Sequence, residues 1–135
     1  MINAASATPP VPWTLASERA RRGADAEDRA LDYLQSHGLH LVARNVHTRG
    51  GEIDLVMRDD QTLVFVEVRC RQRRDYGGAL GSIDARKQQR MLHAARVWLS
   101  RHPKDAMRSL RFDVVAFEAD AGAQWLRNVL DVAAP

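Results

Sequence analysis

The fold is decided by the stretch 50-GGEIDLVMRDDQTLVFVEVRCRQ-72, in which two apolar runs flank a polar turn. The runs "IDLVM" and "LVFVEV" predict two antiparallel strands joined at Asp60–Gln61, which lies between turn-type residues. With the turn centred there, the numbers of paired residues sum to 121. Because the second strand is apolar on both of its faces, we expect it at the centre of a sheet.

Two acidic residues, Asp54 and Glu67, interrupt these apolar runs. The same register places them directly opposite each other and on one face, with Cβ atoms roughly 5 Å apart. Like charges in this position destabilise a sheet, so the pair needs a shared proton or a cation. Carboxylate oxygens suit a hard divalent ion, and the sequence therefore predicts a Mg²⁺ or Mn²⁺ site.

A helix is predicted from Ser17, a good N-cap, to His37, with Gly38 as its stop signal. Its predicted apolar stripe consists of Ala20, Ala24, Glu27, Leu31 and Leu34. Glu27 can lie at the edge of that stripe and pair with an arginine. Beside an Asp54–Glu67 pair, however, a third inward carboxylate favours its role as a further metal ligand.

Two neighbours of the acid pair each leave two roles open. Glu52 shares the face of Asp54, and is either another ligand or a residue at the strand end near solvent. Arg69 shares the face of Glu67, and either stabilises charge developing on a phosphate or neutralises Glu67. It cannot act as a general base, because a guanidinium stays protonated.

A second helix is predicted from Ser82 or Asp84 through His102, and Pro103 helps to end it. Lys87 and Gln88 fall in its first turns, and the N-terminus of a helix favours phosphate. A solvent-exposed helix end is the alternative role for these two residues.

The other segments complete an α/β order. Residues 39–46 and 109–119 are predicted strands, 74–82 form a glycine-rich loop, and 124–132 form either a short strand or an irregular edge. The order α-β-β-β-α-β, with a last strand left open, predicts a central mixed sheet flanked by helices. Within the fourth strand, Asp113 is expected to be structural and to pair with an arginine.

Length and composition predict one domain at residues 17–132, preceded by a flexible tail at 1–16. The chain has no long apolar run, and prolines interrupt a start that lacks a basic segment, so neither a membrane span nor a signal peptide is expected. The single cysteine, Cys70, excludes an internal disulfide and a cysteine zinc site. We therefore expect a cytoplasmic protein.

The basic residues occur in three clusters, although the net charge is only +3 and the pI is about 9.6. The clusters are "RARR" at 19–22, "RCRQRR" at 69–74 and "RKQQR" at 86–90. Each alone is typical of a solvated surface, but three of them around an acidic hairpin favour a nucleic acid, most simply DNA. The predicted nucleic-acid contacts are Arg49, Arg71, Arg73, Arg74, Lys87 and Gln88.

Glu27, "GEIDLV", "FVEVR", "RKQ" at 86–88 and "RFDVV" at 111–115 together resemble the YraN family of small bacterial proteins. That family looks like a compact branch of the PD-(D/E)XK nucleases, similar to archaeal Holliday-junction resolvases, and the resemblance covers about residues 18–131. It implies a restriction-endonuclease-like core in which Glu27, Asp54 and Glu67 hold one or two Mg²⁺ ions. It also implies that these acids, with Arg69, cleave a phosphodiester.

One position departs from the family pattern, which expects lysine where this chain has Arg69. Arg69 can replace a lysine that stabilises charge, but not one that transfers a proton. Three functions therefore stay open: a metal-dependent endonuclease acting on DNA, including branched DNA; a nucleic-acid-binding module that does not cut; and a protein-interaction adaptor. The sequence also leaves a homodimer open.

Overall fold

The structure, a computed structural model, describes residues 15–71, 83–118 and 122–130. Its elements are α1 (Leu15–Ser36), β1 (His40–Thr48), β2 (Gly51–Asp59), β3 (Thr62–Arg71), α3 (Ala85–Ser100), the 3₁₀ turn η2 (Asp105–Met107), β4 (Leu110–Glu118) and β5 (Gly122–Leu126). The predicted α/β order is confirmed, including the last strand, while η2 was not predicted. The predicted glycine-rich loop and nearly all of the predicted tail lie outside the described residues.

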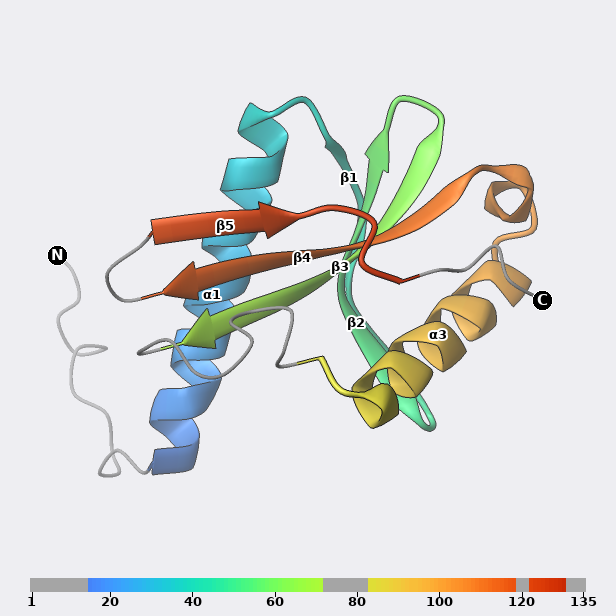
Figure 1. Ribbon diagram of the computed structural model, residues 1–135. Coiled ribbons are helices and arrows are strands. Elements are labelled where there is room, and N and C mark those ends of the chain that lie inside the picture. Colours follow the sequence, from blue (N-terminus) through green and yellow to red (C-terminus); the bar gives the residue numbers. More distant parts are fainter. Residues whose placement is uncertain (1–14, 72–82, 119–121, 131–135) are drawn as a thin grey trace, which may run out of the picture.

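The five strands form one mixed sheet in the order β1-β2-β3-β4-β5, which places β3 at the centre as predicted. β3 and β4 are parallel, and the other neighbouring strands are antiparallel. One core layer packs between the sheet and α3, the other between the sheet and α1. The two helices therefore cover opposite faces of the sheet (Figure 1).

The predicted register of the central hairpin is confirmed from Asp59↔Thr62 to Leu55↔Val66. Asp60, at the turn, has a φ of 55°, a left-handed conformation that aspartate tolerates. The predicted faces of β3 are also confirmed. Leu63 and Phe65 pack in the core layer of α3, whereas Val64 and Val66 pack in the layer of α1.

The first helix ends as predicted but begins earlier and turns a partly different face to the sheet. Gly38, with a φ of 92°, follows its last turn, whereas Ser17 lies inside the helix and is not its N-cap. The predicted stripe is confirmed at Leu34, and Leu31 packs partly buried against the same core, but the prediction is wrong at Ala24. Ala24 is exposed, and the buried side chains are Ala26, Ala30 and Leu34, which recur every fourth residue. Alanine is small enough to suit either face, so it defines the stripe poorly.

The other long helix, α3, begins where the sequence predicts it. The Asp84 carboxylate caps it by accepting a hydrogen bond from the Lys87 backbone N–H at 2.8 Å. Trp98 is 5% exposed and belongs to the core rather than to a binding surface. Among the described residues, no helix combines the length and the apolarity that a bilayer crossing requires.

Gly51 marks the point where the hairpin of β1 and β2 packs against α3. A Cβ atom at this position would overlap the backbone carbonyl of Arg90, whereas the space around Gly23 in α1 is open. We expect Gly51→Ala to lower the free energy of unfolding by about 1–3 kcal/mol, because the helix must move away. Gly23→Ala should instead raise it by about 0.5–1 kcal/mol, through helix propensity. Urea denaturation of both variants tests this, and equal stabilities would contradict the close packing.

Candidate metal and acid site

The acid site lies in a fork of the sheet. The pairing of β2 with β3 stops at Leu55↔Val66; beyond it, β2 pairs only with β1, and β3 only with β4. Asp54 and Glu67 are the next residues on each side, so they stand where the two strands separate. The Asp54 carboxylate accepts a hydrogen bond from the Val68 backbone N–H at 2.8 Å and so replaces the missing ladder acceptor.

Glu67 is the buried member of the pair, only 3% exposed. Two cations reach its Oε2 atom. The Lys87 Nζ atom of α3 lies 3.1 Å away, and the Arg69 Nη1 atom of β3 lies 3.3 Å away. Lys87, predicted as a phosphate contact on an open helix end, thus projects into the acid site. Although β3 carries arginine where the family pattern expects lysine, the site contains a lysine after all, supplied by α3.

The two carboxyl groups hold their protons more strongly than ordinary acids. Burial and the neighbouring Asp54 raise the pKa of Glu67 to about 7, although Lys87 and Arg69 oppose the increase. Burial also raises the pKa of Asp54. The hydrogen bond from the Val68 backbone and the one with the Glu67 side chain act in the opposite direction. A raised pKa in a pair of facing carboxyls indicates a site that gains by accepting a proton or a cation.

Glu27 lies at the border of this site, on α1. Burial raises the pKa of Glu27, and the negative charge of Asp54 raises it further, so these two acids interact electrostatically. Its Oε1 atom also lies 3.8 Å from the Arg44 Nη2 atom of β1. Glu27 therefore shows one of the two roles considered for it, the pairing with an arginine, and its charge also acts on that of Asp54.

Glu52 occupies the solvent side of the site. Its carboxylate is 44% exposed and lies 3.4 Å from the His47 Nδ1 atom, which matches the role of a residue at a strand end. Within the described parts of the chain, no three His, Cys, Asp or Glu side chains converge closely enough to hold an ion by themselves. The core of the site is thus the Asp54–Glu67 pair, with Glu27 and Glu52 beside it.

The predicted nucleic-acid contacts are placed unevenly. Arg49 is exposed in the turn between β1 and β2, and that turn packs against α3 beside Arg90. Gln88 donates a hydrogen bond to the Ile83 carbonyl at 3.2 Å, so its amide helps to order the helix start. Arg71 ends β3, and the remaining predicted contacts, Arg73 and Arg74, lie outside the described residues.

The predicted structural role of Asp113 is confirmed. Its fully buried carboxylate pairs with the Arg111 guanidinium at 3.1 Å. It also accepts hydrogen bonds from the Trp125 Nε1 atom and from the Asn128 backbone N–H, both at 2.9 Å. These bonds fix β5 and the segment that follows it, an arrangement that the sequence did not reveal.

The raised pKa of Glu67 predicts a pH-dependent stability. Its pKa is about 7 in the folded protein against an ordinary value of 4.5, so folding takes up a proton between these pH values. The contribution of Glu67 to stability is therefore largest below pH 4.5, falls as the pH rises to 7, and is constant above pH 7. The difference in pKa corresponds to a loss of about 3 kcal/mol.

Glu67→Gln removes this titrating group, whereas the groups that do not interact with Glu67 titrate alike in both proteins. We expect the variant to be more stable than the wild type at pH 8, and this advantage to shrink by about 2–3 kcal/mol at pH 5. Urea denaturation at the two pH values measures the difference. A stability difference that stays the same at both pH values would show that Glu67 titrates normally.

Fold and site together define a class: an α/β domain with a nuclease-like core, whose carboxylate pair and lysine lie at a fork in the central sheet. Residues 26–117 match the family described as "Uncharacterised protein family UPF0102". The chain belongs to this family, the YraN family of the PD-(D/E)XK nuclease-like superfamily, which confirms the resemblance found in the sequence.

Relatives in this family match most of the chain. A UPF0102 protein of Alcanivorax borkumensis is 47% identical over 118 residues, which are 84% of this chain and 94% of the relative. One of Pseudomonas fluorescens is 50% identical over 113 residues, covering 81% and 92% of the two chains. One of Halorhodospira halophila is 49% identical over 117 residues, covering 87% and 93%. The similarity therefore extends over more than four-fifths of the chain.

Proposed function

We propose that the protein is a metal-dependent endonuclease that binds DNA in the cytoplasm and hydrolyses phosphodiester bonds. One observation carries the proposal: two facing carboxylates with raised pKa values share a fork of the sheet with a lysine and an arginine. A purely structural ion pair does not need two adjacent acids, because the second acid only adds repulsion.

The donor atoms fit Mg²⁺ or Mn²⁺. Mg²⁺ binds through one or two protein carboxylates and completes its shell with water and substrate phosphate. Asp54 and Glu67 would supply those two carboxylates, and Glu27, whose charge acts on that of Asp54, would add a further negative charge for the ion to balance. When bound, the ion would polarise the phosphodiester and lower the pKa of a water molecule.

The two cations that contact Glu67, Arg69 and Lys87, are expected to have different roles in cleavage. Arg69 and Lys87 both contact Glu67, so each is placed to stabilise the negative charge that develops on a phosphate during cleavage. Of the two cations, only Lys87 could also take part in a proton transfer, because a guanidinium stays protonated. We therefore assign to Lys87 the role that the family pattern gives to a lysine on the strand.

Basic side chains next to the site support DNA as the substrate. Arg86 and Arg90 are exposed on the same helix as Lys87, and the turn that carries Arg49 packs against Arg90. These arginines place positive charge on the helix that carries Lys87 and on the adjoining turn, and such charge attracts the phosphate backbone without reading its sequence. Branched DNA is the preferred form by resemblance to the junction resolvases.

A non-catalytic DNA-binding module is the second candidate. The observation that favours it is the pairing of both cations with Glu67, which neutralises the carboxylate without a metal. In that case the site keeps the nuclease geometry but leaves no group free to act on water.

Cleavage assays separate the two candidates. We expect wild-type protein with Mn²⁺ to cut a four-way junction or a linear duplex, and Asp54→Ala to form no product, because the ion loses one of two ligands. Salt-sensitive binding without product in any divalent metal would favour the binding module. Equal cleavage by the wild type and Asp54→Ala would exclude the proposed site.

A further inference from the structure

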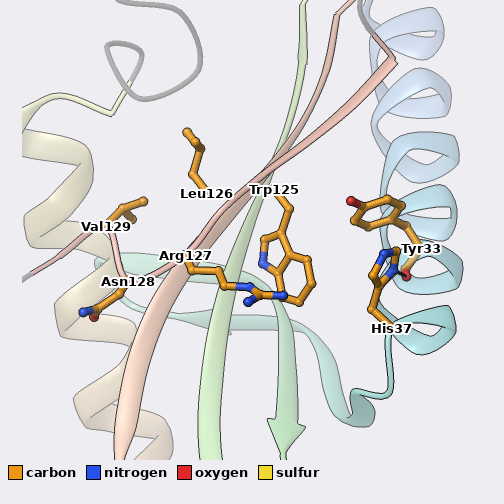
Figure 2. Close-up of a pocket in the computed structure, with 7 residues that line it drawn as sticks. All are labelled: Tyr33, His37, Trp125, Leu126, Arg127, Asn128 and Val129. Carbon is orange, nitrogen blue, oxygen red and sulfur yellow. Dashed lines mark hydrogen bonds between the residues drawn. The ribbon is translucent and has the colours of Figure 1, made fainter.

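A second site lies at the other edge of the sheet, beside β5. A groove of about 700 Å³ is lined there by Tyr33 of α1, by His37 just after that helix, by Trp125 of β5 and by the following residues Arg127 and Asn128. Figure 2 shows the Tyr33 and His37 side chains facing the indole, with the Arg127 side chain lying across it. This volume is in the range of pockets that bind small organic groups.

The groove is a rigid aromatic platform. Trp125 meets Tyr33 and His37 edge to face, with ring centroids 6.1 Å and 5.7 Å away. The buried carboxylate of Asp113 holds the indole N–H at 2.9 Å, so the ring cannot turn. The Trp125 ring is already held by this hydrogen bond and is only partly buried, so it loses little conformational entropy when another flat ring stacks on it.

The charges around the platform select an anion. The Arg127 guanidinium lies 3.9 Å from the centre of the Trp125 ring and is exposed. No lining residue among those described is acidic, and the carboxylate beneath, Asp113, is fully buried and paired with Arg111. Aromatic faces together with an exposed guanidinium match a flat base joined to a phosphate.

The groove is separate from the acid site. Trp125 packs with the core layer of α1, whereas Glu67 lies on the opposite face of β3, among the residues that face α3. β4 also lies between β3 and β5 in the sheet. The groove and the acid pair are therefore two distinct sites on different strands of the sheet.

We propose that this groove binds an unpaired base of single-stranded DNA, stacked on Trp125 with its phosphate on Arg127. The inference rests on the proposed DNA binding and adds that the substrate carries a single-stranded segment. Stacking between a base and an aromatic ring tolerates every base, so the groove recognises the absence of pairing rather than a sequence.

Fluorescence anisotropy in EDTA tests the groove without cleavage, with a labelled ten-nucleotide oligo-dT and a labelled blunt duplex as probes. We expect Trp125→Ala to weaken oligo-dT binding about tenfold, and Trp125→Phe to restore much of it. Arg127→Ala should weaken oligo-dT binding and reduce its salt dependence, whereas Arg101→Ala, at the exposed end of α3, should not. Duplex binding should stay unchanged in all four variants.

The outcomes separate this inference from the proposed function. Duplex binding without oligo-dT binding by the wild type would overturn the groove and leave the nuclease proposal intact. Binding of neither probe would overturn both. If Trp125→Ala does not fold, Arg127→Ala carries the test. A wild-type dimer that Arg127→Ala converts to a monomer, with oligo-dT binding unchanged, would instead make the groove a self-association surface and overturn the inference.

Discussion

Replacing Lys87 with alanine is expected to reduce the rate of DNA cleavage by about 10²–10⁴-fold at saturating Mn²⁺. The Lys87 Nζ atom lies 3.1 Å from the Glu67 Oε2 atom. Unlike Arg69, Lys87 could both stabilise negative charge and take part in a proton transfer. Single-turnover cleavage of a duplex measures the rate. The protein should still bind the DNA, since the surrounding arginines remain.

Two variants control this experiment. Arg86→Ala removes a neighbouring exposed cation from the same helix end, and should weaken DNA binding slightly without changing the saturated rate. Arg69→Ala removes the other cation on Glu67 and should cost less than Lys87→Ala, because arginine transfers no proton. A large loss of cleavage rate in Arg69→Ala, together with normal cleavage by Lys87→Ala, would assign the catalytic role to Arg69 instead of Lys87.

Asp113→Ala is expected to lower the free energy of unfolding by about 3–5 kcal/mol, the largest stability effect predicted for this chain. The substitution leaves the Arg111 guanidinium, the Trp125 indole N–H and the Asn128 N–H without their buried acceptor. Each such unsatisfied donor is costly in a site that excludes water. Urea denaturation at pH 7 measures the change.

Asp28→Ala is the matched control for this prediction. Asp28 also pairs with an arginine, Arg44, at 2.8 Å, but its side chain is 64% exposed. Exposed ion pairs contribute about 0–1 kcal/mol, so this variant should remain close to the wild type. Similar losses in the two aspartate variants would show that burial does not set the cost.

The central hairpin could be predicted from the sequence because its information is local. Alternation and the Asp60 turn fix the register as far as Leu55↔Val66, and Asp54 and Glu67 are the next residues on the two strands. The sequence does not show that the ladder ends one pair earlier, with Val68 bonded to the Asp54 side chain. The end of the ladder depends on the neighbouring strands, because beyond this point β2 pairs only with β1 and β3 pairs only with β4.

The contacts of Lys87 and Trp125 could not be predicted, because they depend on how distant elements pack. Asp84 correctly predicted the start of α3, and so placed Lys87 in its first turn. Only the packing of α3 on the sheet points that side chain at Glu67. β5 is five residues long, too short for a clear alternation, so the platform at Trp125 was missed.

Titration calorimetry of Mn²⁺ into the wild type and Asp54→Asn at pH 8 tests the central claim, that the fork of the sheet holds a divalent cation. The wild type should bind Mn²⁺, and more weakly at pH 6, because protons compete for Glu67 below its pKa of about 7. Asp54→Asn, which keeps the side-chain shape but loses the charge, should show no binding. Equal binding by both proteins, or none by the wild type at pH 8, would contradict the account.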